Sequence, residues 1–351
     1  MENKIKFIST DTLSVDFFRG IRKIAVFTDN DYGELKSIVG EYGVKVYRVD
    51  DKIVNTDSSL IVGIGGDKAL RRAKQVAIIE NTECMLIPAV PTEEATIGFL
   101  IDDNCKIRYL TETTVVAVNS LLNNQPRENL SRGIESISGV LINLIDQAVC
   151  SFLQGENRSG EKLLELVKTT LSNSNKYASP YPTLGSDLMK DVYELTSELS
   201  SDNCNSFVAT KLFLADKRKN EAEQNCLFQV AFSIFAVYNS YRPNAELILP
   251  PDRQKYILKL KELCPNAEIP PLYDDFMYAR FVLSDRYDQI IDAIQGFVGL
   301  AKTYFRLSGY SAYERRKEFS AVDFLNILPQ TAELDSNNSL LKHIYASGYL
   351  K

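Results

Sequence analysis

Residues 60–74 of the chain read LIVGIGGDKALRRAK, and this stretch decides the fold prediction. A short apolar strand leads into Gly63, Gly65 and Gly66, and a helical pattern begins at Asp67. Glycine lets a backbone approach a ligand closely, and a helix N-terminus carries partial positive charge, so such a unit can hold a phosphate. The same glycines also suit a tight strand-to-helix connection without any ligand. Both interpretations stay open from this stretch alone.

The composition indicates two ordinary globular domains with a small molecule or another protein as partner. A length of 351 residues exceeds the usual size of one core, and 45% hydrophobic with 25% charged residues is typical of globular chains. The net charge is −6, and basic residues are scattered among acids, so we expect neither a nucleic-acid partner nor a membrane anchor. The first residues lack the apolar core of a signal peptide, which predicts a cytoplasmic protein.

Metal and disulfide chemistry have few residues to use. The six cysteines are widely spaced without a CxxC pair, which predicts incidental thiols rather than a zinc site or a disulfide framework. His343 is the only histidine, which excludes a site with several histidine ligands. We expect His343 to be a surface residue, and no nucleophile triad is indicated.

The pattern of the chain changes between residues 120 and 130. Before that point, strand-like apolar runs alternate with helical patterns, and a hairpin and a last strand follow. The expected strands are 23–28, 44–49, 60–62, 85–87, 99–101, 106–110 and 115–118, and the expected helices are 32–42 and 69–79. After residue 129 helical spacing dominates, apart from a loop at 174–185. We therefore predict a Rossmann-like parallel-sheet domain over 1–125, followed by an all-helical domain over 126–351.

In chain order, several motifs resemble the dehydroquinate-synthase-like superfamily. These motifs are RKIAVFTDND, GIGGDKALRRAK, LIPAVPTEEAT, TTVVAVNSLLNNQPRENLSRGIESISG and SIFAVYNSYRPNAEL. Within the superfamily the chain is most similar to glycerol-1-phosphate dehydrogenase, glycerol dehydrogenase and the iron-containing alcohol dehydrogenases. The resemblance covers most of residues 20–250. It implies a dehydroquinate-synthase-like fold in which NAD(P) binds across the glycine loop. In such a fold one metal ion polarises the substrate alcohol for hydride transfer.

The resemblance implies a nucleotide site of six residues. They are Asp29, Gly63, Gly65, Gly66, Asp67 and Lys68. Asp67 replaces a third glycine of the family, and its charge would repel a diphosphate. Arg71 stands where the family has an aspartate, and we expect Arg71 and Arg72 on the solvated face of their helix. Because the other five residues of this site are retained, some affinity for NAD(P) or another nucleotide is still expected.

The metal ligands that the resemblance implies are missing. Ser136 in GIESISG replaces a carboxylate, Leu247 replaces one histidine, and Ile294 or Gln295 in IQGFVGLAK replaces the other. We therefore predict no metal, and we expect metal-dependent alcohol oxidation to be lost. Tyr238 and Arg242 are expected to line the cleft, where Arg242 either holds an anion or forms a structural ion pair.

Three functions stay open from the sequence. We favour a divergent member that binds a nucleotide or small ligand, or that assembles with itself or with an active paralogue. The alternative is an active NAD(P)-dependent oxidoreductase for a polyol or polyol phosphate, with its metal held by Glu135 and Glu246. A one-residue shift turns a helical side chain by about 100°, so we expect these two to be solvated surface acids. A metal-independent lyase or isomerase is the third.

Overall fold

The computed structural model describes residues 5–31, 33, 35, 43–52, 55–101, 107–153 and 160–197, with isolated helical positions between 258 and 307. The chain divides into two compact units. The first comprises Met1–Asp102, Lys106–Ile134 and Pro180–Thr196, and the second comprises Asp103–Cys105, Glu135–Ser179 and Ser197–Lys351. The domain boundary at residue 125 stays a prediction.

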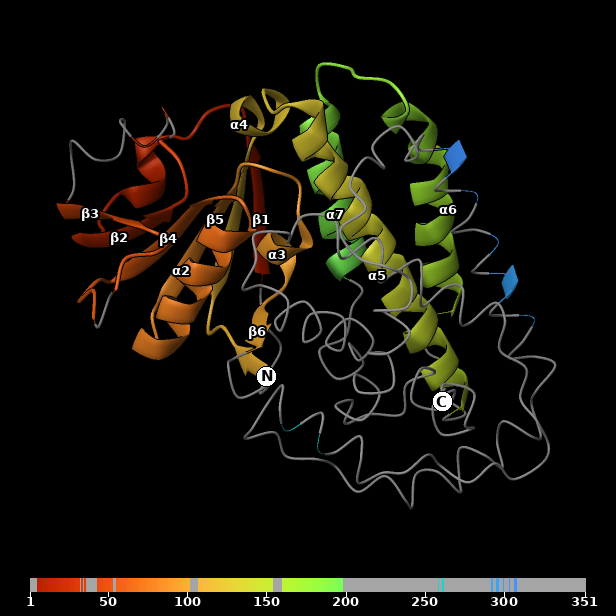
Figure 1. Ribbon diagram of the computed structural model, residues 1–351, viewed down its shortest axis with the longest axis horizontal. Coiled ribbons are helices and arrows are strands. Elements are labelled where there is room, and N and C mark those ends of the chain that lie inside the picture. The colour runs from red at the N-terminus through yellow and green to blue at the C-terminus, as the bar shows by residue number, and fades with distance from the viewer. Residues whose placement is uncertain are drawn as a thin grey trace. The chain divides into compact units, whose positions relative to one another are not determined.

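A six-stranded parallel sheet forms the centre of the first unit (Figure 1). Its strand order is β1-β8-β5-β4-β2-β3. The strands are β1 Ile5–Thr10, β2 Lys23–Thr28, β3 Gly43–Arg48, β4 Leu60–Gly65, β5 Glu83–Pro88 and β8 Thr113–Val118. Strands β2, β4, β5 and β8 are almost wholly buried, which explains their continuous apolar sequences. The predicted α/β class is confirmed.

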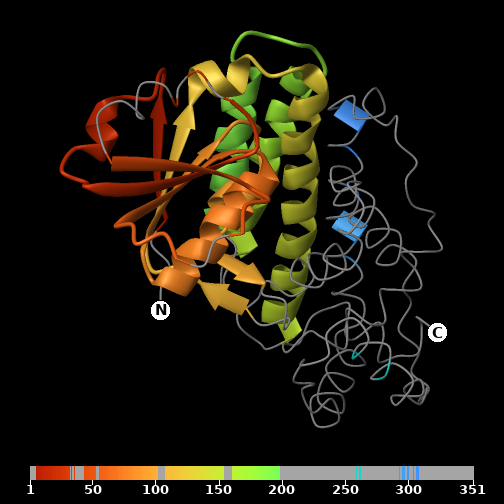
Figure 2. The same ribbon diagram turned by 60° about the vertical axis from the view of Figure 1, so that its left-hand side comes forward.

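Helices alternate with strands in the first part of the chain, and only helices follow β8 in the described residues. They are the 3₁₀ helix η1 Val15–Phe18 and the α-helices α2 Asp67–Glu80, α3 Glu93–Thr96, α4 Asn119–Asn123, α5 Arg127–Leu153, α6 Gly160–Tyr177 and α7 Leu184–Ser197. Helix α2 lies across one face of the sheet and packs on β4 and β5 (Figure 2). From residue 119 onward, every element in the described part of the chain is helical, as expected. None of the helices described is long and apolar enough to cross a bilayer.

The predicted hairpin is present as a separate antiparallel pair. Strand β6 Phe99–Ile101 pairs with β7 Ile107–Tyr109, and Phe99 lies opposite Tyr109. The two rings meet edge to face, with centroids 6.3 Å apart. The expected turn between the strands lies outside the described residues.

The sequence did not predict β1, which forms one edge of the sheet beside β8. An edge strand that mixes lysine and serine with apolar residues lacks the continuous apolar run of the central strands. The ring of Phe7 on β1 stacks on Tyr193 of α7, with centroids 4.3 Å apart. This contact between distant segments is one reason why residues 180–196 belong to the first unit.

The loop predicted at 174–185 is wrong at both ends. Helix α6 continues to Tyr177, and α7 begins at Leu184. The hydroxyl of Ser172 donates to the Thr169 carbonyl at 2.7 Å, and that of Ser174 donates to the Leu171 carbonyl at 2.6 Å. Because these polar side chains are satisfied by carbonyls of their own helix, they do not end it.

Several predicted helices lie wholly or largely outside the described residues. They are the helix at 32–42 and those that helical spacing suggests around 225–238, 253–263, 288–307 and 321–328.

Candidate functional site

Strands β2 and β4 are neighbours in the sheet, and a topological switch point lies at their carboxyl ends. There the connections that leave the two strands run to opposite sides of the sheet. From β2 the chain continues to β3 on one side, whereas from β4 it continues to β5 on the other. Ligands of open α/β sheets bind at such switch points. Asp29 follows β2 directly, and Gly66 follows β4. The sheet topology therefore brings the two predicted halves of the nucleotide site together.

The turn between β4 and α2 is shorter than the sequence predicted, because β4 continues through Gly65. Gly63 lies inside the strand, and a Cβ added there would come within 2.8 Å of the Ala73 Cβ on α2. Gly63 thus permits α2 to pack on the strand. The prediction that Gly63 lies in the turn is wrong. Only Gly66 connects β4 to α2, as the N-cap residue of the helix.

Asp29 lies directly against the glycine turn. The Gly66 N–H donates a hydrogen bond of 2.9 Å to Asp29 Oδ2. Gly65 has a φ of 142°, and a Cβ added to it would overlap Asp29 Oδ1. The loop that carries Asp29 is held by Thr28, whose hydroxyl donates to the Asn30 carbonyl at 2.7 Å. An interaction within the protein thus explains why glycine is needed at position 65.

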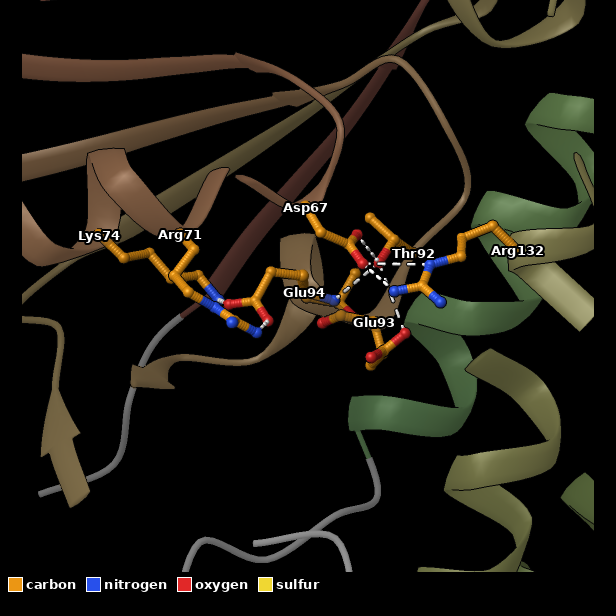
Figure 3. A network of polar contacts seen from close by, with 8 residues as sticks. Asp67, Arg71, Lys74, Thr92, Glu93, Glu94 and Arg132 are labelled. Atoms are coloured by element: carbon orange, nitrogen blue, oxygen red, sulfur yellow. Dashed lines mark hydrogen bonds and ion pairs between the residues drawn. The ribbon is translucent and has the colours of Figure 1, made fainter. Parts of the chain in front are cut away.

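Asp67 is held by two side chains from other segments (Figure 3). Arg132 of α5 forms an ion pair with Asp67 through Nη2, and its Nε donates to Asp67 Oδ2 at 3.1 Å. The hydroxyl of Thr92, the N-cap residue of α3, donates to Asp67 Oδ1 at 2.6 Å. The side chains of Asp67 and Arg132 are 15% and 11% exposed, respectively. The negative charge of Asp67, which the sequence left unbalanced, is balanced by Arg132.

A second ion cluster lies beside the first on α2 and α3 (Figure 3). Arg71 Nη2 and Lys74 Nζ each lie 3.1 Å from a carboxylate oxygen of Glu94. The Lys74 side chain is fully buried, and that of Glu94 is 5% exposed. The expectation that Arg71 and Arg72 are solvated is wrong, because Arg71 pairs with Glu94 and half-buried Arg72 donates to the Asp51 carbonyl at 3.2 Å.

Two of the predicted metal positions can be placed. Ser136 on α5 is fully buried, and Gln295 occupies an exposed helical position. Glu135 is 1% exposed, so the expectation of a solvated acid is wrong at this position. In the described part of the chain, no group of three or more histidine, cysteine or acidic side chains could hold a metal ion. Tyr238, Arg242, Glu246, Leu247 and His343 lie outside the described residues.

Sequence reasoning missed Arg132 and Thr92 as site residues. Arg132 lies 65 positions from Asp67, and Thr92 lies 25 positions from it. The sequence did contain one signal for such a partner. Asp67 is an acid at the start of a helix, at a position where the family that the chain resembles has glycine. A charge of that kind, half-buried, needs a cation nearby.

The fold is that of the iron-containing alcohol dehydrogenases. An iron-containing alcohol dehydrogenase from Corynebacterium glutamicum is 14% identical, covers 98% of this chain and 94% of its own, and has a TM-score of 0.56. The NADH-dependent butanol dehydrogenase A of Thermotoga maritima is 12% identical, with coverages of 100% and 97% and a TM-score of 0.53. At these identities the likeness concerns the fold alone.

Among curated proteins, the chain is similar to the glycerol-1-phosphate dehydrogenase [NAD(P)+] of Metallosphaera sedula. The two are 27% identical over 121 residues, which is 32% of this chain and 33% of the relative. The chain thus matches about a third of that relative's length. No protein-family profile matches the chain. The predicted resemblance to the dehydroquinate-synthase-like and iron-containing alcohol dehydrogenase superfamily is confirmed.

Proposed function

We propose that this chain binds a nucleotide at the switch point between β2 and β4 and does not oxidise alcohols with a bound metal. The observation that carries the first part is the start of α2 at the switch point. There Gly66, a residue without a side chain, is the N-cap of a 14-residue helix, and its own N–H donates to Asp29 Oδ2. The helix dipole and the first-turn N–H groups attract an anion such as a phosphate.

The surrounding charges support a phosphate at the start of α2. The ion pair with Arg132 balances Asp67, so this carboxylate repels an incoming anion less than an unpaired one would. Lys68, the second residue of α2, is exposed and adds a positive charge to the same turn. The names of the relatives give NAD(P)+ in one case and NADH in another, which makes nicotinamide nucleotides the first ligands to test.

The available donor atoms do not fit the metal that the fold family implies. Ser136 offers a hydroxyl where a carboxylate is expected, Leu247 offers no donor, and Gln295 offers an amide. The chain holds one histidine in total, whereas the family pattern requires two. A transition metal held by such groups would bind weakly. We therefore derive no catalytic step through a metal.

A second candidate is an active NAD(P)-dependent oxidoreductase for a polyol or polyol phosphate. The burial of Glu135, next to the lost carboxylate position, favours it. Assembly with itself or with an active paralogue stays a prediction in either case.

Nucleotide titrations and elemental analysis of the purified protein test the proposal. Titration with NADH, followed by its fluorescence, and with AMP, followed by calorimetry, should show saturable binding of at least one of them. Elemental analysis should find less than stoichiometric metal. Gly66→Val should abolish nucleotide binding, because its side chain fills the space before the turn, while Gly299→Ala, at a position with no atom within 4 Å, should not.

The outcomes separate the two candidates. Saturable nucleotide binding without metal supports the binding protein. Stoichiometric metal together with alcohol-dependent reduction of NAD(P)+ supports the oxidoreductase. Failure of NADH and AMP to bind overturns the proposed nucleotide site.

A further inference from the structure

We propose that Arg132 is the phosphate-binding residue of the nucleotide site, and that a bound phosphate replaces Asp67 as the partner of its guanidinium. This inference rests on the proposed function and identifies the side chain that receives the charge of the ligand. Neither the sequence motifs nor the resemblance assigns Arg132 to the site. The inference follows instead from the contacts at the start of α2.

The first step concerns where the guanidinium lies. The side chain of Arg132 reaches from α5 to the first residue of α2 (Figure 3). Its Nε donates to Asp67 Oδ2 at 3.1 Å, and its Nη2 donates to the same oxygen. Asp67 directly follows Gly66, the N-cap residue of the helix. The guanidinium therefore lies beside the first turn of α2, where the helix dipole also favours a negative charge.

The second step concerns what the guanidinium can bind. A guanidinium presents five N–H donors in a planar fork, which suits the oxygens of a phosphate as well as those of a carboxylate. The side chain of Arg132 is only 11% exposed, so water screens its charge incompletely. A charge-assisted hydrogen bond at such a site is stronger than one at an exposed surface. A phosphate at the start of α2 thus meets a suitable cation.

The third step concerns how Asp67 is held once a phosphate has replaced it on Arg132. The Thr92 hydroxyl donates to Asp67 Oδ1 at 2.6 Å, and this contact does not involve Arg132. The Asp67 carboxylate also lies at the start of its helix, where the dipole stabilises a negative charge. Its side chain is 15% exposed and so keeps some contact with water. The exchange still lowers phosphate affinity, because Asp67 competes for the guanidinium.

The test compares AMP with adenosine, because these two ligands differ only in the phosphate. Calorimetry measures both affinities for the wild type, for Asp67→Asn, and for Asp67→Asn combined with Arg132→Met. The Asp67→Asn background is used because Arg132→Met then leaves no unpaired carboxylate at position 67. Asp67→Asn combined with Lys23→Met is the matched control, since it has the same formal charge. Lys23 is the first residue of β2, at the amino end of the strand, and its 59% exposed side chain pairs with Asp57.

We expect Asp67→Asn to raise AMP affinity by about threefold or more, because no carboxylate then competes for the guanidinium. Adding Arg132→Met should lower AMP affinity by about tenfold or more and leave adenosine affinity within about twofold. Adding Lys23→Met should change AMP affinity by less than about threefold. Thermal unfolding checks that each variant is folded, and Arg132→Gln replaces Arg132→Met in the same comparison if the methionine variant unfolds.

Each other result has a distinct meaning. If AMP binds and Arg132→Met leaves its affinity unchanged in the Asp67→Asn background, the role of Arg132 is overturned while the proposed function stands. An equal loss with Lys23→Met, or an equal loss of adenosine affinity, overturns the role as well, because neither depends on a contact between Arg132 and the phosphate. Unchanged AMP affinity in Asp67→Asn alone overturns the exchange. If AMP binds none of the proteins, the role is overturned, and the NADH titration decides whether the proposed function also fails.

Discussion

Arg132 on α5 forms an ion pair with Asp67, the first residue of α2, although 65 positions separate them in the chain. Asp67 follows the glycine turn directly, and the positive charge of Arg132 balances its negative charge there. The pair therefore links the stability of the fold to the electrostatics of the candidate nucleotide site.

Arg132→Met should destabilise the first unit. The substitution leaves the Asp67 carboxylate mostly buried without the Arg132 charge, although the Thr92 hydroxyl still donates to it, and removing one member of a buried pair lowers the free energy of unfolding by about 3 kcal/mol. Urea unfolding measures the change. In the double variant with Asp67→Asn, more than half of the loss should be recovered, since no unpaired charge remains. Equal stability of the single variant and the wild type would show that the ion pair contributes little.

Glu94→Gln should be more harmful than Lys74→Met. Glu94 lies between two cations, Arg71 and Lys74, so losing its charge leaves two positive groups facing each other at a buried site. In Lys74→Met, by contrast, Glu94 keeps Arg71. We expect a loss of about 3 kcal/mol for the first change and of less than about 1.5 kcal/mol for the second. Lys68→Gln, on an exposed side chain of the same helix, is the control in the unfolding measurements.

Gly65→Ala should lower stability through its backbone and through Asp29 together. A φ of 142° is strained for any residue with a side chain, and the added Cβ overlaps the Asp29 carboxylate. We expect a loss of about 1–3 kcal/mol for the strain alone. Combined with Asp29→Ser, the alanine should be tolerated better. A cost that is the same with and without Asp29 would mean that the carboxylate does not press on the turn.

The thiol of Cys84 should make stability depend on pH above 9. Burial raises the pKa of Cys84 from 9.0 to about 12. An acid with a raised pKa in the folded state keeps its proton there, while the unfolded chain releases it, so stability falls as pH rises from 9 to 12. The slope from this group is about 1.4 kcal/mol per pH unit. Comparing the unfolding free energies of the wild type and Cys84→Ala between pH 8 and 10.5 isolates this contribution. Parallel curves would contradict it.

The central strands could be predicted because burial on both faces forces continuous apolar runs, as in residues 23–28 and 60–65. The edge strand β1 could not, since its mixed composition has no such signal. The helical residue Ser174 was taken for the start of a loop because its hydrogen bond to a helix carbonyl is invisible in the sequence.

The site was predictable only where neighbours in the chain form it. The glycines follow from the strand-to-helix pattern, whereas Asp29 and Lys68 were assigned to the site by the resemblance to the family. The partners of Asp67 and Glu94 come from other elements, and no local pattern marks such long-range contacts. The resemblance marked Asp67 as a departure from the family, but it gave no partner for this carboxylate.

Hydrogen exchange in the presence of AMP tests the nucleotide site most directly. Mass spectrometry of peptides from the intact protein reports the exchange rate of each segment with and without a saturating concentration of AMP. Binding at the start of α2 predicts slower exchange of the amides in residues 66–70 and at Asp29, with little change in β1 and α7. Unchanged exchange at residues 66–70, or protection confined to other segments, would contradict a nucleotide site at the switch point.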